Sequence, residues 1–360
     1  MKSKGFTLIE LLAVIVILAI IALIATPVVL NIISSTKESA TLQSAQFYLD
    51  ASEQSISRKM IKDSTFKTSS CLIENEGNLL CSGEVINIEV KGEVPNSGVI
   101  EFEKGKIIDT TLIYDDVIIG KKEEKLVYLE SGLYDEEGNL IASWDELVND
   151  YNIDVEKDYT FDDLSRPGEI LLSNENLKVG TKLIIDNSVT EIGDYAFSQN
   201  TTLTTIIIPN SVINIGKYSV SSCTSLTHVI IPNSVTNIEQ NAFRSCINLK
   251  GIIIPNSVTS LENTVFEFCR SLESVVLGNG IISMGIGIFR NCSNLKGVII
   301  LNNITTIAAM TFHSCENLKE IIIPNSVTTI DAGAFVGCRE LEKVTLGKNV
   351  TSIENSAFIG

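Results

Sequence analysis

The pattern of apolar and polar residues changes along the chain. Residues 6–33 are almost continuously apolar, residues 31–60 place apolar side chains three or four positions apart, and residues 85–128 contain short alternating runs. From about residue 182 a 23-residue pattern repeats to the last residue. In order, these patterns predict a long apolar helix, an amphipathic helix, a small β-sheet and a solenoid.

The apolar run from Phe6 to Ile33 is long enough to span a membrane. Its 28 residues correspond to about 42 Å of helix, more than the ~30 Å hydrocarbon core requires. Lys2 and Lys4 precede the run, and this positive flank predicts a cytoplasmic amino terminus with the bulk of the chain outside. A cleaved secretory signal fits less well, because the run is too long and continues into a polar amphipathic helix.

Glu10 is the one ionisable residue of this run, and a carboxylate inside a membrane helix usually has a partner. Residues 4–12, Lys-Gly-Phe-Thr-Leu-Ile-Glu-Leu-Leu, resemble the processing site of type IV prepilins and pseudopilins. The resemblance implies that a prepilin peptidase cuts after Gly5 and methylates the new amine of Phe6. It also implies that Glu10 neutralises this amine, within a subunit or on its neighbour. A plain signal anchor with a tolerated acid is the alternative.

The same helix is expected to continue beyond the membrane. Pro27 matches the mid-helix proline of the prepilin family, where a missing amide donor loosens the helix. The following segment carries an apolar stripe that predicts packing on the subunit's own sheet. The stripe consists of Leu42, Ala45, Leu49, Ser52, Ile56 and Met60.

Residues 61–130 predict a small pilin-like domain with a three- to five-stranded antiparallel sheet. Strands are expected at Val85–Val90, Val99–Phe102, Ile107–Tyr114, Val117–Ile119 and Lys125–Tyr128. Residues 91–106 are similar to the heads of Gram-positive pilins. Cys71 and Cys81 lie in the exported part, where a disulfide closing this ten-residue step would contribute roughly 2.5–3 kcal/mol. A disulfide and a pair of free thiols on a hairpin are both open.

The segment that follows is strongly acidic. Residues 130–163 hold twelve acidic side chains and a single basic one, Lys157. Calcium binding is conceivable, but the acids lack the ligand spacing of an EF-hand loop, which favours a solvated acidic connector over residues 131–175. Arg166-Pro167-Gly168 marks the expected domain boundary.

Residues 176–360 consist of 23-residue repeats, which cannot bury their apolar face singly and are therefore expected to stack as a solenoid. The repeats resemble BspA-type leucine-rich repeats, with the pattern Leu-x-x-Ile-x-Ile-Pro-x-Ser-Val-x-x-Ile-x-x-x-Ala-Phe-x-x-Cys. Cysteines recur at the same step and point the same way on neighbouring coils, which favours core packing over disulfides, metal binding or redox use. They are Cys223, Cys246, Cys269, Cys292, Cys315 and Cys338.

Strand alternation turns Leu203, Ile206 and Ile208 inward and Ile207 outward. The outward column of the repeats is unexpectedly apolar, and a continuous exposed apolar strip is a candidate partner-binding surface. Simple β-propensity filling of a sheet is the alternative. The strip consists of Ile207, Ile230, Ile253, Val276, Ile299 and Ile322.

Charge and composition exclude several functions. The formal charge of −17 argues against direct binding of nucleic acid. His228 and His313 are the only histidines, which argues against a histidine-based triad and against a multi-histidine metal site. We therefore expect no enzymatic activity, no cofactor and no metal.

These features predict an α+β pilin-like domain, formed by a transmembrane helix and a small antiparallel sheet, followed by a leucine-rich-repeat solenoid with a parallel sheet. Residues 1–5 would be the prepilin leader and residues 6–60 the transmembrane and assembly helix. The expected function is that of a minor type IV pilin or pilin-like surface protein, first single-pass in the membrane and then on the cell surface or pilus. The bulk of the solenoid favours a low-copy position.

The expected partners are prepilin peptidase, other pilin subunits, the membrane and an extracellular protein or host ligand, which the extracellular carboxy-terminal region would bind in adhesion. Two other functions remain open. One is a pseudopilin of a secretion or DNA-uptake system, and the other is a membrane-anchored surface receptor that does not polymerise.

Overall fold

The structure is a computed structural model. It describes residues 37, 40–63, 66–74, 77–82, 84–90, 93–114, 117–122, 125–130, 132–134, 140–143, 181–300 and 303–360. The leader, the apolar run, Gly5, Phe6, Glu10 and Pro27 lie outside these residues. Within the described part of the chain, no helix has both the length and the apolar composition needed to cross a membrane.

A helix at residues 40–62 precedes a seven-stranded antiparallel sheet of order β3-β2-β1-β4-β5-β6-β7. The strands are β1 (Ser70–Ile73), β2 (Leu79–Cys81), β3 (Glu84–Ile86), β4 (Ser97–Glu103), β5 (Lys106–Tyr114), β6 (Val117–Lys122) and β7 (Lys125–Leu129). The sheet is larger than the expected three to five strands. The pattern missed β1 and β2, because runs of three or four residues are too short for alternation to stand out.

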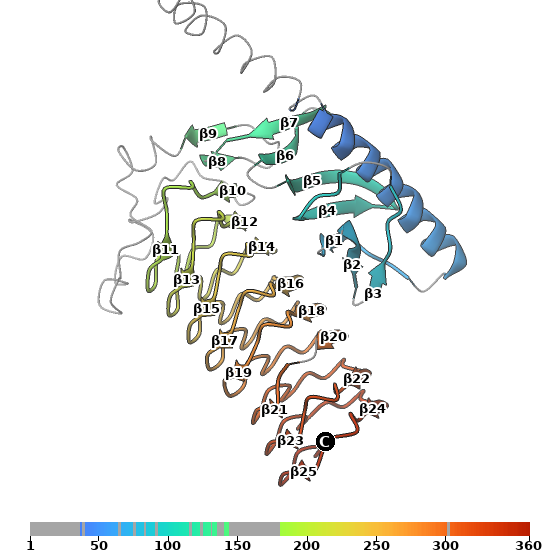
Figure 1. Ribbon diagram of the computed structural model, residues 1–360, viewed down its shortest axis with the longest axis vertical. Helices are drawn as coiled ribbons and strands as arrows, with labels where there is room; N and C mark the ends of the chain where they lie inside the picture. Colours follow the sequence, from blue (N-terminus) through green and yellow to red (C-terminus); the bar gives the residue numbers. More distant parts are fainter. Residues whose placement is uncertain are drawn as a thin grey trace, which may run out of the picture.

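The helix covers one face of this sheet (Figure 1). Its predicted stripe faces the sheet: Ala45, Leu49, Ser52 and Ile56 are buried, and Leu42 and Met60 pack against the same core. Tyr48 is also fully buried, and its hydroxyl donates to the Gly77 carbonyl at 2.7 Å. The apolar face of the helix is therefore buried within the chain itself, against the sheet.

Side chains alternate across the sheet, and both faces are apolar. Cys71, Ile73, Leu79, Ile100, Phe102 and Leu112 belong to the core beneath the helix. Their neighbours in sequence, Leu72, Leu80, Val99 and Ile113, pack on the opposite side against the solenoid. A strand buried on both faces has no polar side, and β1 and β2 accordingly consist almost entirely of apolar residues.

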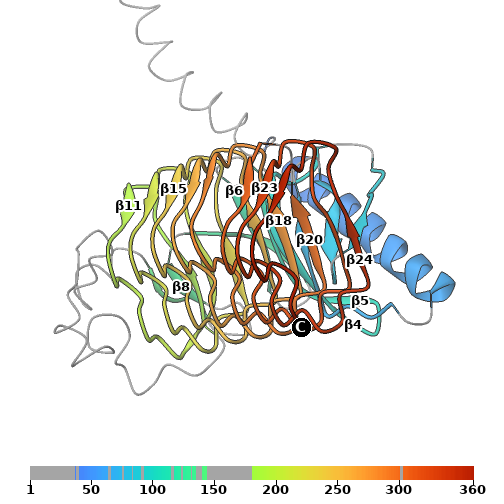
Figure 2. The same ribbon diagram turned by 90° about the horizontal axis from the view of Figure 1, so that it is seen from below.

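Residues 181–360 form a solenoid with two rows of parallel strands (Figure 2). The row facing the antiparallel sheet contains β10 (Thr181–Ile184), β12 (Leu203–Ile207), β14 (His228–Ile230), β16 (Gly251–Ile254), β18 (Ser274–Leu277), β20 (Gly297–Ile300), β22 (Glu320–Ile322) and β24 (Lys343–Thr345). The second row contains β11 (Glu191–Ile192), β13 (Asn214–Ile215), β15 (Asn237–Ile238), β17 (Ser260–Leu261), β19 (Ser283–Met284), β21 (Thr306–Ile307), β23 (Thr329–Ile330) and β25 (Ser352–Ile353). The paired residues are 23 positions apart, as Ile206 and Val229 are.

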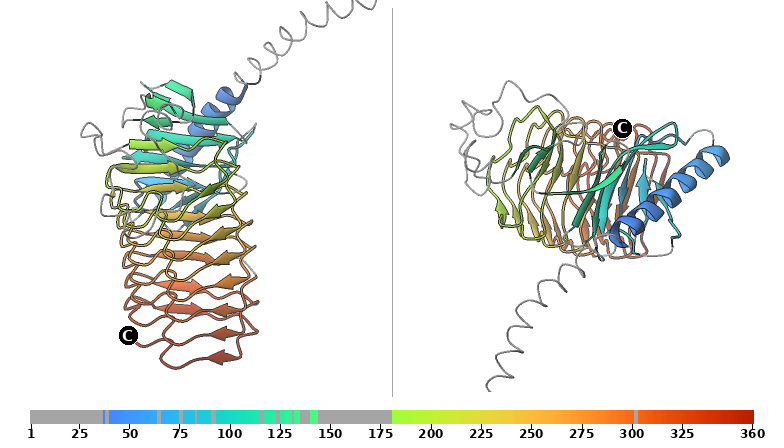
Figure 3. Two further views of the ribbon diagram at one scale, coloured as in Figure 1. Left: turned by 90° about the vertical axis from the view of Figure 1, so that its left-hand side faces the viewer. Right: turned by 90° about the horizontal axis from the view of Figure 1, so that it is seen from above.

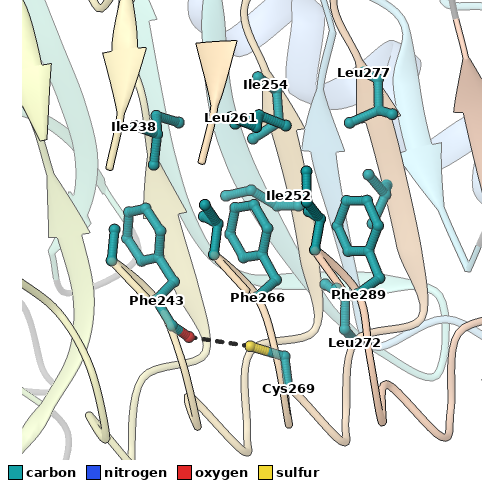
Figure 4. Packing of buried hydrophobic residues seen from close by; sticks show 14 of the residues in the cluster. Ile238, Phe243, Ile252, Ile254, Leu261, Phe266, Cys269, Leu272, Leu277 and Phe289 are labelled. Atoms are coloured by element: carbon teal, nitrogen blue, oxygen red, sulfur yellow. Dashed lines mark hydrogen bonds between the residues drawn. The ribbon is translucent and has the colours of Figure 1, made fainter. Parts of the chain in front are cut away.

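In the core of the solenoid, residues at equivalent positions of successive repeats stack in columns. The rings of Phe243 and Phe266 are 5.3 Å apart, and those of Phe266 and Phe289 are 5.5 Å apart. Figure 4 shows these three rings side by side, with the thiol of Cys269 reaching the Phe243 carbonyl of the preceding coil at 3.2 Å. Because each coil covers the apolar face of its neighbour, the repeats are stable only as a stack.

Two further strands lie within residues 131–175, the segment expected to be a connector. They are β8 (Gly132–Tyr134) and β9 (Leu140–Ser143). β8 pairs antiparallel with β10, and β9 pairs with β8, so they extend the parallel row at its first coil. The expectation of a solvated connector is therefore wrong for these two strands. They were not predicted because each is short and is surrounded by acidic residues in the sequence. Most of the acidic residues lie outside the described part.

Candidate functional site

The predicted strip lies on the outward side of the parallel row, as strand alternation indicates. The structure does not leave it exposed. Ile207 is 1% exposed, Ile230 5% and Val276 7%, and Ile253 and Ile299 are partly buried. Ile322, at 68% exposure, is the one member that faces open space.

The antiparallel sheet covers the strip through two apolar clusters. In the first, Leu72, Leu80 and Val99 pack against Val276, Ile253 and Ile299. In the second, Ile113, Ile118 and Leu129 pack against Tyr134, Ile184, Ile207 and Ile230. The expectation of a continuous exposed strip is thus wrong up to β20. The outward apolar side chains form the surface on which the antiparallel sheet of the same chain packs.

Polar contacts join the two sheets between these clusters. Lys182 Nζ lies 3.5 Å from Asp109 Oδ2 and donates to Thr111 Oγ1 at 2.8 Å. His228 Nδ1 lies 3.5 Å from Glu101 Oε1. Burial, and then the nearby Asp109, raises the pKa of Glu101. The contact surface therefore mixes apolar packing with partly buried charge, as interfaces between domains commonly do.

A cavity of about 600 Å³ opens between the two sheets at the carboxyl ends of the parallel strands. Its lining is mixed, with apolar side chains that include Ile113, Ile118, Ile207 and Ile230 beside polar ones such as Ser97 and Glu130. Its rim is formed by the turns that follow the strands and carries asparagine side chains, among them Asn187 and Asn233. This volume lies within the roughly 300–1,000 Å³ of small-molecule sites.

A second cavity, of about 330 Å³, lies at the opposite end of the strands, and we call it the lysine pocket. Its residues come from β1, β2 and the segments beside them, and from positions at or just before the start of β14, β16, β18 and β20. They include Lys67, Ser69, His228, Lys250, Glu273, Ser274 and Lys296. Sequence reasoning missed this pocket, because its two walls are more than 100 residues apart in the chain.

His228 is buried at the lysine pocket, with 1% of its surface exposed. Burial, and then the positive charges of Lys250 and Lys182, lowers the pKa of His228 to about 3. The imidazole is therefore neutral at physiological pH. The signal that could have pointed to this position is a histidine at a site where the other repeats carry Thr, Gly, Ser, Glu or Lys.

The cysteines occupy two different environments. Cys71 and Cys81 face each other on β1 and β2 and form a disulfide. Cys223, Cys246, Cys269, Cys292, Cys315 and Cys338 are free and buried in the solenoid core. Burial raises the pKa of the Cys246 thiol to about 12. In the described residues, no group of His, Cys, Asp and Glu side chains is arranged to hold a metal ion.

The fold and the sequence together define a leucine-rich-repeat protein. The model of the BspA-type leucine-rich repeat region matches residues 175–296 and 238–360, with six copies. These matches cover more than half of the chain, which therefore belongs to the BspA-type leucine-rich-repeat proteins. The prokaryotic N-terminal methylation motif matches residues 1–26, the segment that contains Gly5, Phe6 and Glu10.

Solved structures of bacterial leucine-rich-repeat proteins are similar to part of the chain. The leucine-rich-repeat protein TpLRR of T. pallidum is 30% identical, over 44% of this chain and 77% of that one, with a TM-score of 0.42. A protein from Bacteroides ovatus is 27% identical, over 50% and 58%, with a TM-score of 0.36. A leucine rich cell surface protein from Faecalibacterium prausnitzii is 22% identical, over 49% and 79%, with a TM-score of 0.27. Comparison with curated proteins gives no match.

Proposed function

We propose that this chain is a membrane-anchored cell-surface protein that is processed and assembled like a minor type IV pilin and presents its solenoid for protein binding or adhesion. The observation that carries the proposal is the joining of two modules in one chain. An N-terminal methylation motif stands at residues 1–26, and a leucine-rich-repeat region at residues 175–360. The first module accounts for export and assembly, and the second for binding.

The described part of the amino-terminal half supports this function. The helix at residues 40–62 follows the apolar segment that ends at Ile33 and packs along one sheet. In this proposal the sheet and the solenoid follow the membrane or filament segment as its exported cargo. Prepilin peptidase and other pilin subunits are the partners this half would require.

The surface proposed for an extracellular partner is the uncovered end of the parallel row. Ile322 is exposed on β22, and the side chains of Glu320 and Lys343 beside it are largely exposed as well, with 3.7 Å between their charged atoms. Figure 1 shows β22 and β24 beyond the reach of the antiparallel sheet. A protein partner that packs on this end would bury the apolar side chain of Ile322, which the antiparallel sheet leaves exposed.

Two alternatives use the same modules. A pseudopilin of a secretion or DNA-uptake system would use the solenoid to recruit an exported protein, and the charge of −17 argues against contact with DNA itself. A surface receptor that does not polymerise would need the apolar segment as an anchor alone. We propose no enzymatic activity for either half.

Replacing Glu10 by Ala separates these functions. A pilin-like subunit needs the carboxylate to neutralise the methylated amine of Phe6, so we expect incorporation into filaments to fall at least tenfold while the membrane level stays unchanged. Immunogold labelling of sheared filaments measures this. Glu53→Ala, which removes a carboxylate from the described helix, is the control and should incorporate normally. Normal incorporation of the Glu10→Ala chain would contradict the role of the carboxylate in assembly, and absence of the parent chain itself from filaments would favour the simple anchor.

A further inference from the structure

The lysine pocket has an accessible rim and a buried floor. Lys67 and Ser69 are exposed at its edge, on the segment that leads into β1. Leu80, His228 and Ser274 are buried at its base, with exposures of 2%, 1% and 5%. The pocket is therefore open to a small ligand from solvent and closed by both sheets below.

The charge of the lysine pocket is opposite to that of the whole molecule. Three lysines and one glutamate line it, which gives a formal charge of +2 in a chain of −17. Lys296 is held by Glu273 at 2.9 Å. Lys250 donates to Ser69 Oγ in a long contact of 3.4 Å and interacts electrostatically with Glu101, whose Oε1 lies 3.5 Å from His228 Nδ1. Positive charge gathered in a partly enclosed pocket attracts an anion.

The hydrogen bonds of His228 determine what its second nitrogen can do. The Thr227 hydroxyl donates its one proton to the Thr204 carbonyl at 2.9 Å, so at its 3.0 Å contact with His228 Nδ1 it acts as acceptor. Nδ1 therefore carries the proton of the neutral ring. Nε2 is then an acceptor, and it is buried without a hydrogen-bond partner among the residues that the structure describes.

A buried polar atom without a hydrogen-bond partner destabilises the folded chain. A ligand that supplies a hydroxyl to Nε2 removes this destabilisation. The lysines at the rim suit a carboxylate or another oxyanion, and the hydroxyls of Ser69 and Ser274 suit further polar groups of the ligand. One molecule that carries both a hydroxyl and an oxyanion satisfies both sets of groups.

We propose that the lysine pocket binds an acidic sugar, with the carboxylate against Lys250 and Lys67 and a hydroxyl donated toward His228 Nε2. A monosaccharide unit suits a pocket of about 330 Å³. The site lies between the two sheets, so both halves of the chain contribute to it. It is independent of any protein partner at Ile322.

Calorimetric titration of the full chain in detergent micelles tests the assignment, with glucuronate, glucose and inorganic phosphate as probes. We expect saturable binding of glucuronate, at least tenfold weaker binding of phosphate and no binding of glucose. Equal binding of phosphate would reduce the site to a general anion site and overturn the sugar assignment. Equal binding of glucose, or no binding of glucuronate, would overturn the proposal altogether.

Substitutions test which residues of the lysine pocket contact the ligand. Lys250→Ala should weaken glucuronate binding at least tenfold, and Lys67→Ala provides a second variant should the first fail to fold. Lys217→Ala removes an exposed lysine outside the pocket and should bind as the parent chain does. In a His313→Gln background His228 is the sole imidazole, and its Nε2 resonance should move on binding. An unmoved resonance at saturation would contradict the contact with His228.

Discussion

At the scale of the residue, each solenoid cysteine acts as a small buried hydrophobe with one directed hydrogen bond. Cys246 donates to the Val220 carbonyl at 3.0 Å, and Cys315 to the Phe289 carbonyl at 3.2 Å. The acceptor always lies 26 residues earlier, on the preceding coil. The thiol therefore adds a donor to a carbonyl that stacking buries, as at Phe289, whose oxygen also accepts the N–H of Cys292 at 3.2 Å. A plain alkyl side chain could not make this additional hydrogen bond.

The burial of these thiols predicts their reactivity. Burial raises the pKa of Cys246 and Cys338 to about 12, so the reactive thiolate is absent at pH 8 and the core excludes reagents. A thiol-specific chromogenic reagent should find no reactive cysteine in the folded chain, six after unfolding and eight after unfolding with reduction. Rapid reaction of the folded chain would contradict the packed column.

Single residues also show how far sequence reasoning reaches. Alternation correctly placed Ile206 inside the solenoid and Ile207 outside it. It could not reveal that Ile207 is buried, because the covering side chains of Ile113 and Ile118 are distant in sequence. Residues 70–119 did contain a signal, since apolar side chains on both faces of a strand indicate a sheet covered on both sides.

At the scale of the element, the phenylalanine column holds successive coils together. Phe266 is fully buried between Phe243 and Phe289, whereas Phe358 stacks on Phe335 at 4.9 Å and is 39% exposed. The repeat period predicted this column from sequence. How deeply each ring is buried depends on the coils on both sides of it, and the repeat pattern alone does not give this.

Replacing Phe266 by Ala should therefore lower the free energy of unfolding more than replacing Phe358 by Ala. Phe266→Ala leaves a closed cavity and should lower the free energy of unfolding by about 3–5 kcal/mol. Phe358→Ala should lower it by less than about 2 kcal/mol, because water reaches the site. Denaturant titration of both variants measures the difference, and equal losses would contradict the graded burial.

At the scale of the whole molecule, the described chain is a three-layer arrangement of helix, antiparallel sheet and solenoid (Figure 3). The middle layer has a core on each face, so the solenoid is fixed to the helix by a packed interface. In a pilin-like assembly, such packing would hold the solenoid at a set orientation to the filament. The separate modules were predictable from sequence, but their contact was not, because it joins segments far apart in the chain, such as Thr111 and Lys182, which are 71 residues apart.

The apolar strip is an internal contact up to β20 and a free surface at β22. Ile230→Asp and Ile322→Asp place the same charge at equivalent positions of the repeat, one 5% and one 68% exposed. Denaturant unfolding of these two variants tests the claim most directly. We predict a loss of at least about 3 kcal/mol for Ile230→Asp and a change within about 0.5 kcal/mol for Ile322→Asp. Equal stability of the two variants would contradict the account.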